Sequence, residues 1–409
     1  MTKQRYFFTV LILGALTALG PFSIDMYLPG FPAIARSLHT TTAEVSLSLS
    51  SFFVGLAAGQ LLYGPLLDKY GRKRPLYFGL SLYLVASVGC FFATSIETLI
   101  IIRFVQAIGS CAAGVASMAM VRDIFPLEEN AKIFALLILI LGASPMLAPT
   151  IGGYVTVIWG WHEIFVILGI MAFLILLSVI FFLPESYKPD PSYSLKPAPI
   201  INSFLTVIKE PQFYTYALAG AFVFCGLFVY VSASPIVFME VFKVSAKVYG
   251  WIFATLSIGF IGSSQVNNLL LKKYKSEQII KVSLSIQVIT CLFFVIGSWY
   301  NWYGLGGTIG MIFIMLCCVG ITSPNASALS LAPFEKNAGT ASALLGAMQL
   351  GLGALATLGI GVLNSHSSVP MSSIMEITAV IALLILFFGS KQIVNKVEVS
   401  ETAAAGMAH

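Results

Sequence analysis

The sequence predicts an all-α membrane protein with twelve transmembrane helices in two six-helix bundles and both termini in the cytoplasm. Three observations lead to this prediction. Of the 409 residues, 58% are hydrophobic and only 10% are charged, whereas a soluble domain averages about a quarter charged residues. Long uncharged runs recur along the chain, and the basic residues cluster between them. The composition excludes ordinary soluble domains and disordered chains.

The uncharged runs give the helix count, because a membrane helix needs about 20 mostly apolar residues. The run 282–334 breaks at the aromatic and polar turn 299–304, and the run 337–375 breaks near Asn364–Pro370, after which the last span extends to Ser390. The first run is a span and not a signal peptide, because it continues directly into Asp25 and Pro29. The runs are 6–24, 45–67, 75–96, 104–121, 133–162, 164–184, 211–239, 248–271, 282–334 and 337–375.

The loop charges orient the chain, because cytoplasmic loops carry an excess of lysine and arginine. With the amino terminus inside, only Arg36, Lys243 and Lys247 of the 22 basic residues fall outside, and Arg103 lies within a span. An even number of spans then places both termini in the cytoplasm.

A segment rich in proline and charge, residues 184–199, divides the chain at its midpoint. We expect an amino-terminal bundle at 1–183, a cytoplasmic linker at 184–210, a carboxy-terminal bundle at 211–390 and a cytoplasmic tail at 391–409. The fragment Leu66–Tyr70 (LLDKY) returns as Leu270–Tyr274 (LLKKY) at the end of the second span of the other half. This placement indicates a duplication.

The loop after the second span carries the most specific motif, which runs from Gly64 to Lys73 (GPLLDKYGRK). Positive-inside topology explains its cations, but not the spacing of its glycines and its aspartate. The motif and the six-plus-six arrangement resemble the major facilitator superfamily. The resemblance implies a conformational latch, in which Asp68 and Arg72 pair with neighbouring helix ends in one state only. The predicted latch residues are Gly64, Asp68, Gly71, Arg72 and Lys73.

Span 4 contains Arg103 and Gln106 in an otherwise uncharged stretch. An arginine inside a span costs at least ~2.5 kcal/mol. Arg103 can snorkel to the outer surface, but intramembrane ionisable groups usually have a function. The family resemblance favours an arginine that faces the interior of the first half.

Span 5 carries Pro149, Gly152 and Gly153. These residues resemble the antiporter motif of drug/proton exchangers, with small residues in place of its other glycines. An ordinary small-residue packing face is the alternative, and close helix approach is common to both interpretations. Since importers usually lack the motif, the resemblance implies export.

Asp25 lies near the end of span 1, within the segment Ser23–Pro32. That segment, the arginine of span 4 and the motif of span 5 resemble the bicyclomycin- and chloramphenicol-resistance branch of the drug:proton antiporters. We predict that Asp25 carries the proton and that Arg103 sets its proton affinity. An interfacial carboxylate is the alternative for Asp25, and Glu376 in span 12 is a second carboxylate whose contribution stays open. Candidate residues of the substrate cavity are Tyr27, Gln106 and Tyr230.

No nucleotide-binding glycine loop follows a strand, so we expect no cofactor, with the proton gradient as the energy source. Scattered histidines, and cysteines without metal-ligand spacing, predict free thiols, no metal site and no catalytic site. We therefore expect a monomeric, non-enzymatic exporter of small, partly apolar drug-like compounds in a bacterial inner membrane. It binds protons, its substrate and the lipid bilayer, and no nucleic acid. The alternatives are a proton-coupled transporter of one metabolite and a membrane receptor or scaffold.

Overall fold

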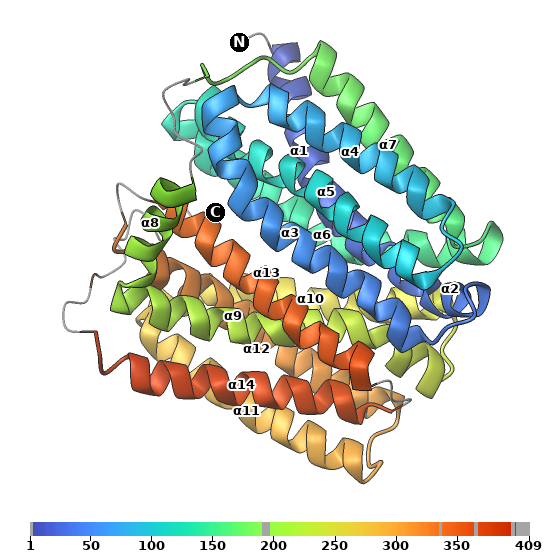
Figure 1. Cartoon of the computed structure of the whole chain (residues 1–409). Helices are drawn as coiled ribbons and strands as arrows, with labels where there is room; N and C mark the ends of the chain where they lie inside the picture. The colour runs from blue at the N-terminus through green and yellow to red at the C-terminus, as the bar shows by residue number, and fades with distance from the viewer. Residues whose placement is uncertain (1–2, 190–196, 335–337, 364–366, 394–396, 398–409) are drawn as a thin grey trace.

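The computed structural model describes residues 3–189, 197–334, 338–363, 367–393 and 397, and all regular structure in these residues is helical. The long helices form two groups that lie side by side (Figure 1). The first group is α1 (Lys3–Asp25), α3 (Thr42–Tyr70), α4 (Lys73–Phe91), α5 (Ile96–Ile124), α6 (Leu127–Ile158) and α7 (His162–Phe181). The second group is α9 (Pro211–Ser234), α10 (Ala246–Leu270), α11 (Ser276–Trp299), α12 (Leu305–Leu331), α13 (Ala338–Leu363) and α14 (Val369–Gly389).

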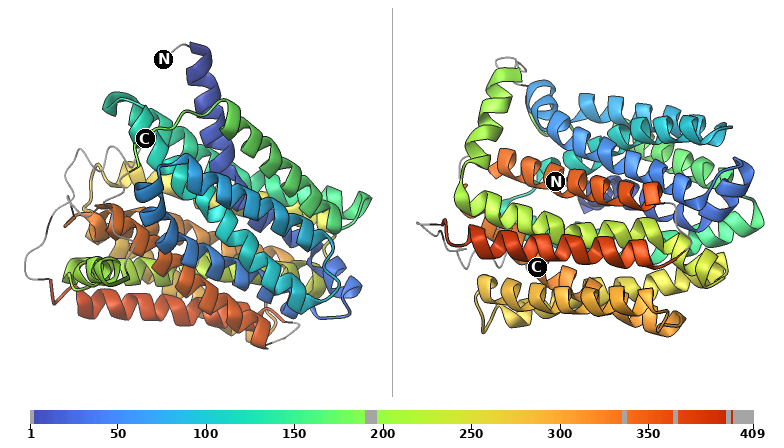
Figure 2. Two further views of the ribbon diagram at one scale, coloured as in Figure 1. Left: turned by 45° about the horizontal axis from the view of Figure 1, so that its top comes forward. Right: turned by 60° about the horizontal axis from the view of Figure 1, so that its bottom comes forward.

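The helices of each group pack mainly against other helices of the same group. Figure 2 shows the two groups from two further directions. In the first half, α5 packs against α1, α3 and α4. In the second half, α9 packs against α12, α13 and α14, and α11 packs against α12 and α14. The halves meet through α3 with α13 and through α6 with α10.

The helices end at the polar, aromatic and proline residues that the sequence places between the apolar runs. The predicted break at 299–304 is confirmed, because α11 ends at Trp299 and α12 begins at Leu305. The predicted break before Pro370 is also confirmed, since α13 ends at Leu363 and α14 begins at Val369. At several starts a hydroxyl caps the helix. For example, Ser95 accepts a hydrogen bond of 3.2 Å from the backbone N–H of Thr98 at the start of α5.

The first membrane helix does not stop cleanly at Asp25. A short 3₁₀ turn, η1 (Leu28–Gly30), follows it, and α2 (Phe31–Ser37) continues the helical path. Together the stretch Arg5–Ser37 is long and apolar enough to span a membrane. Asp25 therefore lies inside a largely helical path, at the point where α1 gives way to the turn before η1.

Within the described part of the chain, eleven helices are long and apolar enough to cross a membrane. The expected span that is not among them is α10. Its 25 residues reach about 37 Å at 1.5 Å per residue, which is ample for a bilayer. Its carboxy-terminal turns contain Ser263, Ser264, Gln265, Asn267 and Asn268, which lower its hydropathy. The count of twelve spans stays a prediction.

The predicted linker is partly helical. The helix α8 (Pro197–Ile208) occupies its second part and is followed almost directly by α9. Pro197 stands at the first helical position, where the missing N–H is not needed, and no proline follows Pro199 within α8. The domain boundaries stay predictions, and the tail 391–409 lies mostly outside the described residues.

Candidate functional site

The helices α6 and α10 approach so closely that side chains are excluded between them. A Cβ atom on Gly153 would lie 2.6 Å from the carbonyl oxygen of Ala246, and one on Gly250 would lie 2.8 Å from the Cα of Thr150. The carbonyl oxygen of Pro149 also lies close to Gly250. The antiporter-motif residues Pro149 and Gly153 therefore form part of the contact between the two halves.

The second contact between the halves joins α3 and α13. Ser50 donates a hydrogen bond of 2.8 Å to Thr357, and a Cβ atom on Gly361 would overlap the side chain of Leu47. Both contacts lie at the end of the bundle where α3 and α10 begin and α6 and α13 end (near α2 in Figure 1). We call this the closed end, because the two halves touch there.

Asp25 lies at the closed end, 5% exposed, as the last residue of α1. A Cβ atom on Gly152 would overlap the carbonyl oxygen of Met26, so α6 packs directly on the backbone beside this carboxylate. The carboxylate interacts electrostatically with Tyr230 of α9 and Tyr249 of α10, which belong to the second half. Asp25 is thus buried where the two halves meet.

Arg103 lies in α5 with no exposed surface. Its guanidinium donates hydrogen bonds to the side-chain oxygen of Gln106 (2.6 Å) and to the backbone carbonyl of Ser23 (2.9 Å). It also lies over the ring of Phe52, 4.1 Å from the centroid, in cation–π geometry. The arginine therefore faces the interior of the first half. Among the described residues no ion pair joins it to Asp25.

The three residues predicted for the substrate cavity are packed in the interior. The hydroxyl of Tyr27 shares a hydrogen bond of 2.6 Å with Ser48, and Gln106 donates one of 2.8 Å to Ser87. The hydroxyl of Tyr230 is buried and has no hydrogen-bond partner in the described part of the chain. In this conformation none of the three lines the large cavity.

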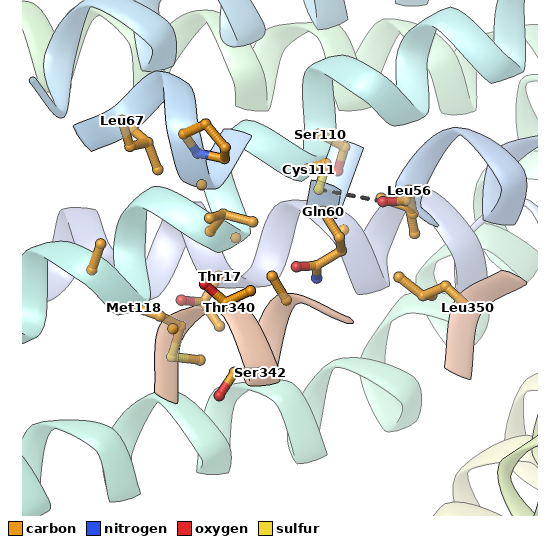
Figure 3. A pocket seen from close by; sticks show the side chains of 18 of the residues that line it. Thr17, Leu56, Gln60, Leu67, Ser110, Cys111, Met118, Thr340, Ser342 and Leu350 are labelled. Atoms are coloured by element: carbon orange, nitrogen blue, oxygen red, sulfur yellow. Dashed lines mark hydrogen bonds between the residues drawn. The ribbon is translucent and has the colours of Figure 1, made fainter. Parts of the chain in front are cut away.

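That cavity has a volume of about 1010 Å³ and lies toward the opposite end of the bundle, which we call the open end. Its lining combines apolar side chains with uncharged polar ones such as Thr17, Gln60 and Thr340 (Figure 3). Asp68 and Arg122 also line it, and Arg122 is exposed. A volume near the top of the usual range of ligand pockets suits a bulky, partly apolar molecule.

The predicted latch residues lie at this open end and make a compact charge cluster. Arg72 donates to Asp68 at 2.8 Å and to Asp123, at the end of α5, at 2.7 Å. Glu185, after α7, accepts hydrogen bonds from the backbone N–H groups of Arg72 (2.8 Å) and Lys73 (3.1 Å). The cluster therefore ties together the ends of α3, α5 and α7 and the start of α4.

The glycines of the latch differ in their roles. Gly71 has a φ of +81°, a conformation that side-chain-bearing residues rarely adopt, so the turn between α3 and α4 requires glycine. Gly64 lines the cavity, and a Cβ atom there would meet nothing within 4 Å. Partial burial lowers the pKa of the Arg72 guanidinium, but its hydrogen bonds with Asp123 and Asp68 raise it by more, so its pKa lies above the ordinary value.

Sequence reasoning missed Asp123 and Glu185. Both are acidic residues at the ends of predicted spans, on the side where the basic loop lies. Their positions in the sequence could have indicated this, because the cations of a basic loop attract carboxylates at neighbouring helix ends. It did not show which carboxylate would reach Arg72.

Glu376 lies in α14, in the second half, and is half-buried. Its Oε2 atom is buried and has no hydrogen-bond partner among the described residues. It belongs to neither the closed-end contact nor the large cavity.

The described residues contain no group of three or more histidine, cysteine or acidic side chains that could hold a metal ion. The six cysteines are free thiols, five of them buried. The interactions that the structure shows at the candidate site are ion pairs, hydrogen bonds and cation–π contacts.

Two helical bundles that meet at one end and enclose a cavity toward the other have the architecture of a membrane transporter. The model of the Major Facilitator Superfamily matches residues 13–358, and the chain belongs to this superfamily.

Comparison with individual proteins refines this assignment. The chain is 34% identical to the "Uncharacterized MFS-type transporter YdgK" of Bacillus subtilis, over 94% of this chain and 96% of that protein. It is 30% identical to the "Bicyclomycin resistance protein homolog" of Haemophilus influenzae, over 95% and 98%. The crystal structure of a D-xylose-proton symporter shares the fold, with a TM-score of 0.73, 14% identity and coverage of 93% and 97%. The resemblance to the drug-resistance branch is confirmed.

For the latch, we expect Asp68→Asn to lower transport several-fold without reducing the amount of protein in the membrane. The Asp68 side chain is 43% exposed, and an exposed ion pair contributes only about 0–1 kcal/mol to stability. We therefore expect the substitution to slow the conformational change of transport and not to lower the stability of the protein. Transport at equal expression is the measurement. Lys272→Gln, at the equivalent position of the second half, is the matched control. Full activity of Asp68→Asn would exclude the latch role.

Proposed function

We propose that this protein exports small, partly apolar drug-like compounds across a bacterial inner membrane in exchange for protons. It works as a monomer by alternating access. In this proposal the chain crosses the membrane twelve times, α10 included, and both termini lie in the cytoplasm. No cofactor takes part, because the proton gradient supplies the energy.

The observation that carries the proposal is the burial of Asp25 between the two halves. An uncompensated carboxylate in a membrane interior is costly, and Asp25 has no ion-pair partner among the described residues. Binding a proton removes that cost. The closed end therefore forms more readily when Asp25 has bound a proton. A proton-driven cycle requires such a link between proton binding and conformation.

The orientation follows from the charges of the open end. Arg72, Lys73 and Arg122 lie there, and the positive-inside rule assigns such residues to the cytoplasm. The structure then corresponds to a conformation in which the cavity faces the cytoplasm and the contacts Gly153–Ala246 and Ser50–Thr357 seal the outside.

In the proposed export cycle, the closed end and the open end of the bundle open in turn. A compound enters the cavity from the cytoplasm, the closed-end contacts separate, and the latch end closes. The compound leaves, and Asp25 takes up a proton from the outside before the closed end forms again. Return of the proton to the cytoplasm completes the cycle. Arg103, fixed two residues from Asp25 along α1 by its bond to Ser23, sets how readily the carboxylate exchanges its proton.

A resistance panel in a strain that lacks its own pumps tests the proposal. We expect the wild-type chain to raise the tolerated concentration of several unrelated, partly apolar antibiotics, and the Asp25→Asn variant to raise none. Protection against no compound, together with transport of a single metabolite, would favour a specific metabolite transporter instead.

A further inference from the structure

The first turn of α9 connects the second half to the chain segment that follows α14. Gln212, the second residue of α9, is 1% exposed, and its side-chain amide bonds to main-chain atoms of Leu329 in α12 and of Val397 beyond α14. We call the segment from Gln392 to Val397 the strap; Gln392, Ile393 and Val397 are its described residues. We propose that the strap, through Gln212, positions the second-half wall of the cavity.

The bond to α12 supplies a partner that this helix lacks. Within a helix, the carbonyl of Leu329 would accept a hydrogen bond from the residue four positions later, but that residue is Pro333, which has no N–H. The side chain of Gln212 donates to this carbonyl instead, at 2.9 Å. Leaving a buried carbonyl unpaired costs about 1–3 kcal/mol, so this bond attaches the end of α12 to the start of α9.

The same amide holds the strap by its main chain. The side-chain oxygen of Gln212 accepts a hydrogen bond of 2.9 Å from the N–H of Val397, and its amide nitrogen donates one of 2.9 Å to the carbonyl of Val397. The side chain of Val397 is 44% exposed, so the contact does not depend on it. Tyr214 donates a hydrogen bond to the side-chain oxygen of Gln392, and Ile393 is buried in the core. The strap is therefore fixed to the start of α9 at two points.

The start of α9 also packs against the wall of the cavity. Phe213, the neighbour of Gln212, lies in a hydrophobic cluster with Ala341 of α13. Thr340 and Ser342, on either side of Ala341, line the large cavity. The starts of α9 and α13 lie at the same end of the bundle (Figure 1). A shift of the first turn of α9 would therefore move the part of α13 that forms the cavity wall.

The second half needs such a contact because the charged latch is not repeated in it. The position that corresponds to Asp68 is Lys272, so an ion pair like that of Asp68 with Arg72 cannot form there. In the first half the latch joins the ends of α3, α5 and α7. In the second half the uncharged amide of Gln212 joins α9, α12 and the strap. The proposal does not rest on the substrate or on the direction of transport.

Distances across the cavity test the proposal in liposomes, in a chain whose six native cysteines are replaced. Spin labels at Arg122→Cys in α5 and Ser342→Cys in α13 occupy exposed positions that line the cavity. We expect Gln212→Leu to roughly double the width of the distance distribution, because a wall held at fewer points samples more positions. A chain that ends after Ile393 should show the same width, and the two changes combined should add nothing. Val397→Ala is the matched control and should leave the width unchanged, because it keeps the main-chain atoms.

Two results would overturn the proposal. An unchanged width in the shortened chain would show that the strap does not position the wall. A broader distribution in only one of the two variants would show that Gln212 and the strap act independently. The shortened chain keeps every span, so the test does not depend on the folding of Gln212→Leu. Because no transport is measured, failure here leaves the proposed export function untouched, and failure of export leaves this result valid.

Discussion

We expect the replacement of Asp25 by asparagine to abolish export against a concentration gradient. Asparagine has nearly the same shape and a hydrogen-bonding amide, but it cannot exchange a proton. Asp25 has no ion-pair partner among the described residues, so the substitution breaks no ion pair and we expect normal amounts of folded protein. Accumulation of a fluorescent substrate in energised everted vesicles is the measurement, with an expected fall to the background of empty vesicles.

The size of this effect follows from the energy that the proton supplies. Moving one charge across the membrane contributes ~2.3 kcal/mol per 100 mV, which corresponds to roughly a fifty-fold gradient of an uncharged substrate at 1.36 kcal/mol per factor of ten. Asp25→Asn should lose this gradient entirely, while downhill movement of uncharged compounds persists without pH dependence.

Glu376→Gln is the matched control, because Glu376 is a second carboxylate within a described span, near the expected outer side. Its half-buried position in α14, away from the contact between the halves, predicts near-normal export. If Glu376→Gln abolished the gradient and Asp25→Asn preserved it, the proton would be carried by Glu376.

We expect the replacement of Gly153 by leucine to block transport, because the contact of Gly153 with Ala246 joins α6 of one half to α10 of the other. A leucine side chain there separates the halves, so the closed end cannot form. Since the contact opens during the proposed cycle, each half still folds, and we expect normal protein levels with export at background. Leakage of protons through the unsealed closed end is a further expected result.

Two neighbouring substitutions make this prediction specific. Gly262→Leu in α10 is the control, because a Cβ atom there meets nothing within 4 Å, and we expect it to transport normally. Gly152→Leu should instead reduce the amount of folded protein, because Gly152 contacts the backbone of Met26 within the same half. Normal pumping by Gly153→Leu would show that the α6–α10 contact is not needed.

Much of the fold was predictable because membrane helices are set by local composition. The breaks at 299–304 and before Pro370 come directly from aromatic, polar and proline residues. The helix α10 is harder to assign, since its last turns carry several polar residues, of which Ser263 and Asn267 are buried and Gln265 is exposed. These residues lower the hydropathy of the segment, although the run 248–271 carries no charge and is long enough for a span.

The sequence points to candidate site residues but not to the contacts that they make. The sequence singles out Asp25, Arg103 and the loop around Arg72, because charges in or near apolar runs need an explanation. It could not show that Arg103 bonds to the Ser23 carbonyl and not to Asp25. Nor could it show that Asp123 and Glu185 contact Arg72, since those contacts depend on how distant helix ends meet.

Purified protein in liposomes with a trapped pH indicator tests proton-coupled export most directly. With the wild-type chain and an imposed pH gradient, adding substrate should drive proton movement in the direction opposite to the substrate. The Asp25→Asn variant should show none, at equal reconstitution. Substrate-driven proton movement that persists in Asp25→Asn would contradict the assignment of Asp25 as the proton carrier, and substrate movement without any proton movement in the wild type would contradict antiport itself.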